Sequence, residues 1–187
     1  EILMQIINRS IKDDRILWLI KKIIENHSGS KGMPIGNLTS QLFANVYLNE
    51  LDRFVKHELK AKYYIRYVDD FVILDASKTK LEYYKTAIGE FLKTLKLELH
   101  PEKSKIYPLH KGIKLLGFRV FYHYKLPCKR NTHQIRKRLN NFIELYEGGF
   151  MSKDEAFKRL EGWDAYAVHA NTYKLRKRLK TTLSRKI

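Results

Sequence analysis

The chain has 187 residues, of which 44% are hydrophobic, and carries a formal net charge of +17. This length and composition fit one globular domain, or one domain with a smaller appendage. No apolar run approaches the roughly 18 residues of a membrane-spanning helix, and the first residues lack a signal-peptide pattern, so we expect a soluble, cytoplasmic protein. The single cysteine, Cys128, excludes an intrachain disulfide, and the histidines show no zinc-ligand spacing.

The positive charge is concentrated in the second half of the sequence. Residues 1–100 contain 16 Lys and Arg against 13 Asp and Glu, whereas residues 101–187 contain 21 against 7. Such an excess is typical of proteins that bind a polyanion, most often nucleic acid. A solvated basic face is the alternative explanation.

Two helices separated by a loop are predicted first. Apolar residues recur at helical spacing over 13–26, behind Asp13 or Asp14 as the N-cap, and again over 39–57. Three glycines and a proline between them predict a loop over 27–37. The buried face of the first helix is expected to carry Ile16, Leu17, Ile20, Ile23 and Ile24.

Strands and a further helix follow. The segment YIRYVDDFVIL (64–74) is strand-like on both sides of two aspartates, which predicts a hairpin. A helix is expected over 78–95, followed by short strands within 95–109 and 113–126. This order predicts an α+β domain in which an antiparallel sheet packs on helices.

From about Pro127 the sequence becomes helical and basic. We predict a helix over 132–147, a second that begins with a capping box at 152–155, and a third that begins behind 171–172. The predicted organisation is therefore an α+β domain over 1–127 and a small basic helical domain over 128–187.

The adjacent carboxylates of Asp69 and Asp70 are the first candidate site. Aspartate is a common turn residue, so a solvated turn is one interpretation. Two aspartates flanked by residues that favour burial also suit a Mg²⁺ site at the edge of a sheet, with positions left open for phosphate oxygens.

Four motifs in order give the chain a resemblance to reverse transcriptases. YVDD matches their Tyr-x-Asp-Asp signature, and GMPIGNLTSQLFANVYLNELD (32–52) resembles their glycine-proline loop and following helix. Downstream, HPEKSKI and LLGF resemble the next two motifs. The resemblance covers most of the chain and implies a polymerase-like palm followed by a helical thumb.

Finer detail resembles the diversity-generating retroelement branch, in Ile35-Gly36, Ser40-Gln41 and the segment GWDAYAVHANTYKLRKRL. Those enzymes copy template RNA into cDNA, misincorporate opposite adenine and work with a small basic accessory protein. A group II intron or retron type of reverse transcriptase, or a non-catalytic RNA-binding remnant of palm and thumb, are the alternatives.

The resemblance implies roles near the catalytic centre. Asp69 and Asp70 would hold two Mg²⁺ ions, which Mn²⁺ can replace, and Lys103 would approach the pyrophosphate of the deoxynucleoside triphosphate, although an exposed lysine is the simpler interpretation. The family places another metal-binding Asp, the sugar-selecting aromatic and the fingers before the region that begins here at residue 1. We therefore expect the chain to be an incomplete, inactive fragment.

Binding roles are implied for three further groups. The nucleotide and template would contact Gly32, Pro34, Ile35, Gly36, Ser40 and Gln41, where Ile35 replaces a hydrogen-bonding Gln of relatives and relaxes selection. Leu116, Gly117 and Phe118 resemble the primer grip, and Lys174, Lys177 and Arg178 share a helix face that would follow a nucleic-acid backbone. The alternatives are an ordinary loop for residues 32–36, a first-turn helical position for Gln41, core packing for Leu116–Phe118 and a solvated face for the basic residues of the tail.

Overall fold

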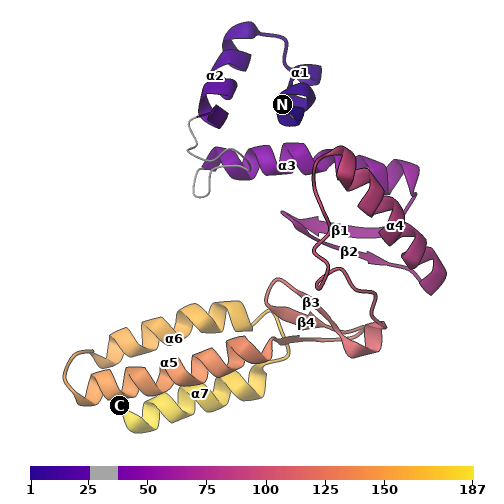
Figure 1. The fold of residues 1–187 in the computed structure, drawn as a ribbon. Helices are drawn as coiled ribbons and strands as arrows, with labels where there is room; N and C mark the ends of the chain where they lie inside the picture. The colour runs from indigo at the N-terminus through magenta and orange to yellow at the C-terminus, as the bar shows by residue number, and fades with distance from the viewer. Residues whose placement is uncertain (26–37) are drawn as a thin grey trace. The chain divides into compact units, whose positions relative to one another are not determined.

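The computed structural model describes residues 1–25 and 38–187. The chain divides into two compact units, Glu1–Ile106 and Tyr107–Ile187 (Figure 1). Each unit has its own small antiparallel sheet and its own helices, so the expected α+β class is confirmed. No helix in the described ranges is long and apolar enough to cross a membrane.

The described residues of the first unit form four α-helices and a β-hairpin. Its elements are α1 (Ile2–Ser10), α2 (Asp14–Glu25), α3 (Leu38–Arg53), a π-helical turn (Phe54–Glu58), β1 (Tyr63–Tyr67), β2 (Asp70–Leu74) and α4 (Lys78–Thr94). The helices at 13–26, 39–57 and 78–95 and the hairpin are thus confirmed, with α3 ending in the π-helical turn. Asp13 caps α2 as expected, because its carboxylate accepts hydrogen bonds from the backbone N–H groups of Arg15 and Ile16.

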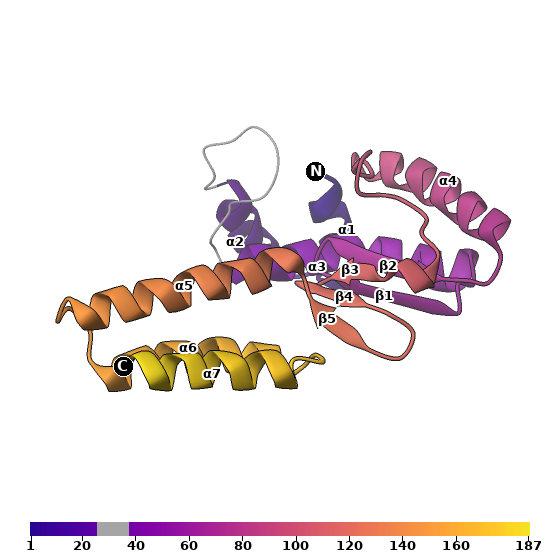
Figure 2. The same cartoon turned by 90° about the horizontal axis from the view of Figure 1, so that it is seen from below.

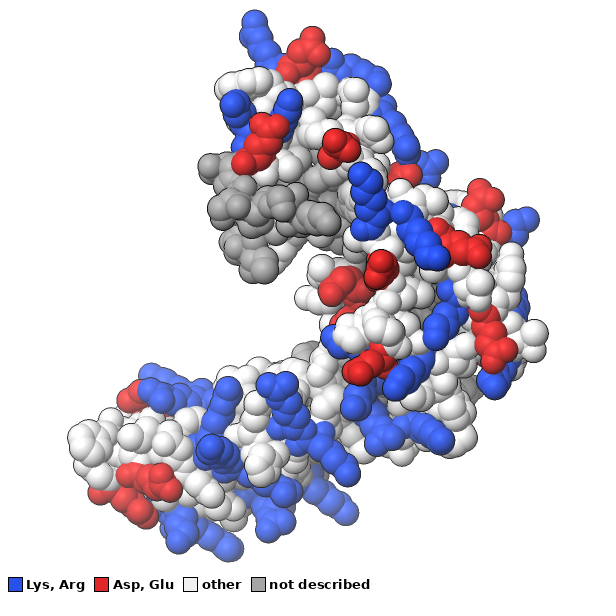
Figure 3. Space-filling view, in the orientation of Figure 1, with Lys and Arg blue, Asp and Glu red and all other residues white. Residues whose placement is uncertain are grey.

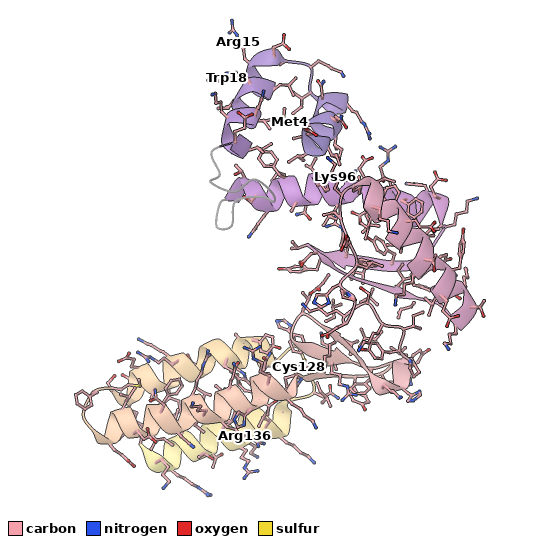
Figure 4. All side chains as sticks on the ribbon, viewed as in Figure 1. Met4, Arg15, Trp18, Lys96, Cys128 and Arg136 are labelled. Atoms are coloured by element: carbon pink, nitrogen blue, oxygen red, sulfur yellow. The ribbon has the colours of Figure 1, made fainter. Side chains whose placement is uncertain are left out.

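The outer part of α2 is more exposed than its periodicity suggested. Leu17 and Ile20 pack against a small core shared with α1 and α3, but Ile16, which we expected on the buried face, is 47% exposed. Trp18 also lies on the outer side of α2 (Figure 4). The contacts of α2 with α1 and α3 cover only a narrow stripe of its surface, so some of its apolar side chains remain exposed to solvent.

One face of the hairpin packs against α3 and α4. Tyr64 pairs with Ile73 and Arg66 with Phe71, and these side chains point toward the helices. The core beneath them is built from Leu51, Val55, Tyr84, Ile88 and Leu92. On the opposite face Tyr63, Ile65 and Tyr67 are exposed. The alternation of the strand therefore separates a packed face from an open one.

The prediction of strands within 95–109 is wrong. This segment contains turns and a short 3₁₀-helix (Leu109–Lys111). Pro101 and Pro108 lack the N–H that a strand ladder needs, which limits pairing here. Leu95, Leu97 and Leu99 instead pack against the core of the first unit as an irregular segment.

The second unit is a three-stranded sheet at one end of a three-helix bundle (Figure 2). Its elements are β3 (Ile113–Leu115), β4 (Phe118–Val120), β5 (Lys125–Pro127), α5 (Lys129–Glu147), α6 (Lys153–Ala167) and α7 (Tyr173–Lys186). The strands form an antiparallel meander. The bundle core contains Ile135, Leu139, Phe142, Ala156, Leu160, Leu179 and Leu183.

The predicted helix starts are confirmed for the last two helices. The Ser152 hydroxyl accepts a hydrogen bond from the Glu155 N–H, as a capping box requires, and Thr172 is the N-cap residue of α7. The boundary between the two compact units falls between Ile106 and Tyr107, so the strands within 113–127 belong to the same unit as the helical bundle. The palm and thumb division at residue 127 is a functional assignment and stays a prediction.

Candidate active site

The two aspartates lie where β1 turns into β2. Tyr67 pairs with Asp70, which leaves Val68 and Asp69 as a two-residue loop. Val68 has a φ of 55°, as in a type II′ turn, where glycine usually occupies this position. A β-branched residue in this conformation stores strain of about 1–3 kcal/mol, which the surrounding structure must offset.

A buried arginine holds this turn on α3. Arg66 Nε and Nη2 donate to the two carboxylate oxygens of Asp52, at 2.8 and 2.5 Å. Its Nη1 donates to the Val68 carbonyl at 2.7 Å and to the Asn45 side-chain oxygen at 3.1 Å. Asn45 and Asp52 are two helical turns apart on one face of α3, so one guanidinium ties the strained loop to the helix.

The hydrogen bonds and charges of this network shift the pKa values of Asp52 and Tyr64. Burial alone would raise the pKa of Asp52, but the hydrogen bonds from Arg66 and Tyr64 and the arginine charge hold it below its ordinary value. Burial and the 2.6 Å hydrogen bond to Asp52 raise the pKa of the Tyr64 phenol. Both effects favour a charged Asp52 with a neutral Tyr64.

The carboxylates of Asp69 and Asp70 take no part in that network. Both residues are exposed, and neither carboxylate forms a hydrogen bond or ion pair with another described residue. Carboxylate oxygens are the ligands that Mg²⁺ prefers, and two on one tight turn fit part of a metal site. No group of three acids, histidines or cysteines gathers among the described residues, so these two residues alone do not form a closed cage.

Other predicted site residues of the first unit are spread along it. Gly32, Pro34, Ile35 and Gly36 lie outside the described residues. Ser40 and Gln41 are in the first turn of α3, where the Ser40 hydroxyl is buried without a hydrogen-bond partner in the described chain and Gln41 is exposed. Lys103 is exposed in a turn, and no contact with Asp69 or Asp70 is observed.

The LLGF segment forms the β3–β4 turn of the second unit. Leu116 and Gly117 are its two loop residues, with φ values of 50° and 80°, as in a type I′ turn. The Gly117 carbonyl accepts hydrogen bonds from the Tyr166 hydroxyl at 2.8 Å and from the Cys128 N–H at 2.9 Å. Phe118 stacks on Tyr166 with ring centroids 4.5 Å apart. The turn is therefore fixed to α5 and α6, near the position of Cys128 (Figure 4).

The basic residues of α7 separate into two groups. Arg176 and Lys180 bind the Asp164 carboxylate, with the Arg176 guanidinium bidentate at 2.6 and 2.8 Å. These contacts, the hydrogen bond from Arg176 first, hold the pKa of Asp164 below its usual range. Lys174, Lys177 and Arg178 are exposed and form no ion pair with the described part of the chain. These three predicted residues, like Arg185 and Lys186 in the last turn of α7, therefore remain available to an external anion.

Sequence reasoning missed the Arg66 network. Its signal was an arginine at an inward-facing position of an otherwise apolar strand, because a buried charge requires a partner. The partner, Asp52, lies near the end of α3, 14 residues before Arg66, and only the packing of β1 on that helix brings the two side chains together. Asn131 and Tyr166, which hold the β3–β4 turn, were likewise not identified.

Comparison with known proteins establishes the family. A family model described as reverse transcriptase (RNA-dependent DNA polymerase) matches residues 4–120, which include the Asp69–Asp70 turn and the β3–β4 turn. The chain belongs to this family.

Curated relatives agree with this assignment. The chain is 30% identical over 165 residues to the Retron Ec73 reverse transcriptase of Escherichia coli, across 83% of this chain and 50% of that protein. It is 27% identical to the group II intron-encoded protein LtrA of Lactococcus lactis, across 76% of this chain and 36% of that protein. Protein YkfC of Escherichia coli K12 is also 27% identical, across 64% and 42%. The chain thus spans half or less of the length of these relatives.

Proposed function

We propose that this chain contributes the palm and thumb of an RNA-directed DNA polymerase that copies template RNA into cDNA. The observation that carries this proposal is the Asp69–Asp70 pair. In a member of the reverse transcriptase family, two unpaired carboxylates stand on a strained turn that a buried arginine fixes to α3. An ordinary solvated turn would not need that support.

The chemistry requires charge neutralisation and positioning. Two metal ions about 3.5–4 Å apart stabilise the attacking and leaving oxygens of phosphoryl transfer. In this proposal Asp69 would hold Mg²⁺ as the main ligand from this turn, and Asp70 would be a second ligand or tune Asp69. A third carboxylate from outside the described residues completes the site, because these residues supply only two at the turn. Lys103 would donate charge or a proton to the pyrophosphate.

The remaining predicted residues have binding roles in the proposal. Ser40 and Gln41 lie toward the nucleotide and template, together with the preceding glycine-proline loop. Leu116, Gly117 and Phe118 support the primer strand, for which their fixed turn provides a rigid platform. Lys174, Lys177 and Arg178 contact the backbone of the RNA–DNA duplex, since they share one helix face and, unlike Arg176 and Lys180, are not bound by Asp164.

Within the family we propose the diversity-generating retroelement branch, with errors at adenines and a small basic accessory protein. Its support is the sequence pattern Ile35-Gly36 and Ser40-Gln41. A retron or group II intron enzyme is the second candidate, which the names of two relatives favour. The error spectrum on template adenines separates these candidates, with few errors at adenine expected for the second.

The decisive experiment measures primer extension on an RNA template. The protein assayed is this chain extended at its N-terminus by whatever residues are encoded in frame upstream of residue 1. We expect extension that requires Mg²⁺ or Mn²⁺, and Asp69→Ala should abolish it by removing a metal ligand. The melting temperature should hold or rise, because the change relieves repulsion with Asp70. Glu90→Ala, at another exposed acid in α4, is the matched control and should extend normally.

Three outcomes would contradict the proposal. Substantial extension by Asp69→Ala would remove the carboxylate from the reaction. A large fall in its melting temperature would make the aspartate structural. Template binding without any extension by the parent would favour a non-catalytic RNA-binding remnant.

A further inference from the structure

The tip of the β4–β5 hairpin presents aromatic and basic side chains to solvent. Val120 pairs with Lys125, and the Phe121 N–H donates to the Tyr124 carbonyl at 2.8 Å, which leaves Tyr122 and His123 at the tip. Tyr122 is 77% exposed, while Tyr124 stacks on Phe121 with centroids 4.5 Å apart. The strand ladder and this stack fix the backbone that carries Tyr122, so its ring projects from an ordered tip.

An open cleft adjoins this tip within the second unit. The Asn171 N–H donates to the Lys125 carbonyl at 2.9 Å and thereby fastens the α6–α7 loop to β5. Between hairpin and loop is a cleft of about 320 Å³ whose lining includes His123, Lys125, Val168 and His169. The cleft thus combines cationic and neutral hydrogen-bonding groups with apolar surface beside an exposed aromatic ring.

The charge around the cleft is of one sign. Within the second unit, residues 107–143 contain nine Lys or Arg and no Asp or Glu, and residues 165–187 contain seven and none. Asp164, the acid that immediately precedes the second stretch, is already bound by Arg176 and Lys180. On the face drawn in Figure 3, acidic side chains of the bundle gather toward the α5–α6 end, away from the sheet. An anionic partner would supply the charge that the surroundings of the cleft lack.

The exposed Tyr122 ring favours a single-stranded over a double-stranded nucleic acid as the anionic ligand. Bases in a duplex stack on one another and are closed to a tyrosine ring, whereas unpaired bases stack on aromatic side chains and leave their phosphates to lysines. We propose that the cleft and hairpin tip, with Tyr122, His123, Lys125 and His169, form a binding site for single-stranded nucleic acid. One unpaired base stacks on Tyr122 and the adjoining phosphates lie along Lys125. This site is independent of the Asp69–Asp70 centre and of polymerase activity.

The test measures the affinity of the 187-residue chain for a fluorescent twelve-nucleotide oligouridylate, an RNA with no internal pairing. Tyr122→Ala should weaken binding by roughly 5- to 100-fold, the range expected for loss of one base–aromatic stack. Tyr122→Phe keeps the ring and should bind like the parent. Phe150→Ala removes a ring that is 83% exposed at the other end of the bundle and serves as the matched control. A DNA oligomer of the same length shows whether the sugar matters, and equal affinity for both sugars fits stacking.

Three results would overturn the proposal. They are unchanged affinity of Tyr122→Ala, a loss that is as large for a twelve-base-pair duplex, and displacement of the oligomer by polyglutamate at the same charge concentration. The last would indicate an acidic protein as the partner. Binding is measured without Mg²⁺ or nucleotides, and Asp69→Ala should retain it, so failure of primer extension leaves this result unaffected.

Discussion

The β1–β2 turn of the first unit and the β3–β4 turn of the second unit have similar backbone conformations that are held by different chemistry. In each, a large apolar residue occupies a left-handed position, Val68 at 55° and Leu116 at 50°. In each, a loop carbonyl accepts hydrogen bonds from the surrounding structure. Around Val68 the donor is a charged guanidinium that also binds Asp52, whereas around Gly117 the donors are a neutral hydroxyl, an amide and a backbone N–H.

The difference follows the charge that each turn carries. Arg66 is only 11% exposed in its side chain, and its charge is balanced on the inner side by Asp52. The neighbouring acids, Asp69 and Asp70, therefore remain unpaired toward solvent and can accept a metal ion. The β3–β4 turn carries no charge, so neutral hydrogen bonds and the Phe118–Tyr166 stack suffice to fix it. The β1–β2 turn is thus held in place while its two acids stay without a counter-charge among the described residues, as the proposed metal-binding role requires.

Removing the charged anchor should have the largest effect. Arg66→Met leaves Asp52 partly buried without its partner, and we expect the free energy of unfolding to fall by about 2–4 kcal/mol. Urea denaturation at neutral pH measures this change. Arg9→Met is the matched control, because Arg9 also forms an ion pair with an acid of α3, Glu50, at 2.8 Å, but is 62% exposed, so the loss should stay below about 1 kcal/mol. Equal losses would mean that burial does not strengthen the Arg66 pair.

The same pair gives a pH signature. Because the folded-state pKa of Asp52 is lowered, its stabilisation is fully present above the unfolded-state pKa, about 3.9 for aspartate, and is lost as the pH falls through the folded-state value. The parent should therefore lose more stability than Arg66→Met as the pH falls below about 4. Parallel pH profiles would contradict the assigned ion pair.

Disturbing the neutral turn should have a smaller effect. Gly117→Ala places a Cβ 2.7 Å from the Tyr166 hydroxyl at a φ of 80°, and we expect a loss of about 1–3 kcal/mol in unfolding free energy. Gly162→Ala in α6 is the matched control, since its Cβ meets nothing within 4 Å and the helix should gain roughly 0.5–1 kcal/mol. If Gly117→Ala were neutral, the turn would not be held as described.

Relieving strain should have the smallest effect. Val68→Gly accepts the left-handed conformation freely, but glycine also gains entropy in the unfolded chain, so the net gain should be about 1 kcal/mol or less. Thermal unfolding measures it, and Leu116→Gly should behave alike in the other hairpin. A clear loss at position 68 would show that the valine side chain stabilises the turn more than its backbone conformation costs.

Much of the local structure was accessible from the sequence. Helical periodicity, the Asp13 cap, the Ser152 cap and the strand alternation around Asp69 each depend on neighbours in the chain, and the structure contains all of them. Of the predicted capping box only the Ser152 half is present, because the Glu155 carboxylate accepts a hydrogen bond from Arg159. The failures were the strands within 95–109 and the burial of Ile16. Both depend on which surfaces other segments cover, a property that periodicity does not contain.

The residue types of the candidate site could be read from the sequence: adjacent carboxylates on a tight turn, a glycine in the LLGF segment and a basic tail. Which of the charges are neutralised depends on how the elements pack. Asp52 meets Arg66 across 14 residues and Asp164 meets Arg176 across 12, and these pairings leave Asp69, Asp70, Lys174, Lys177 and Arg178 without an internal partner. The physical reason is that an ion pair depends on distance in space, which packing sets, while sequence spacing constrains it only within a helix or hairpin.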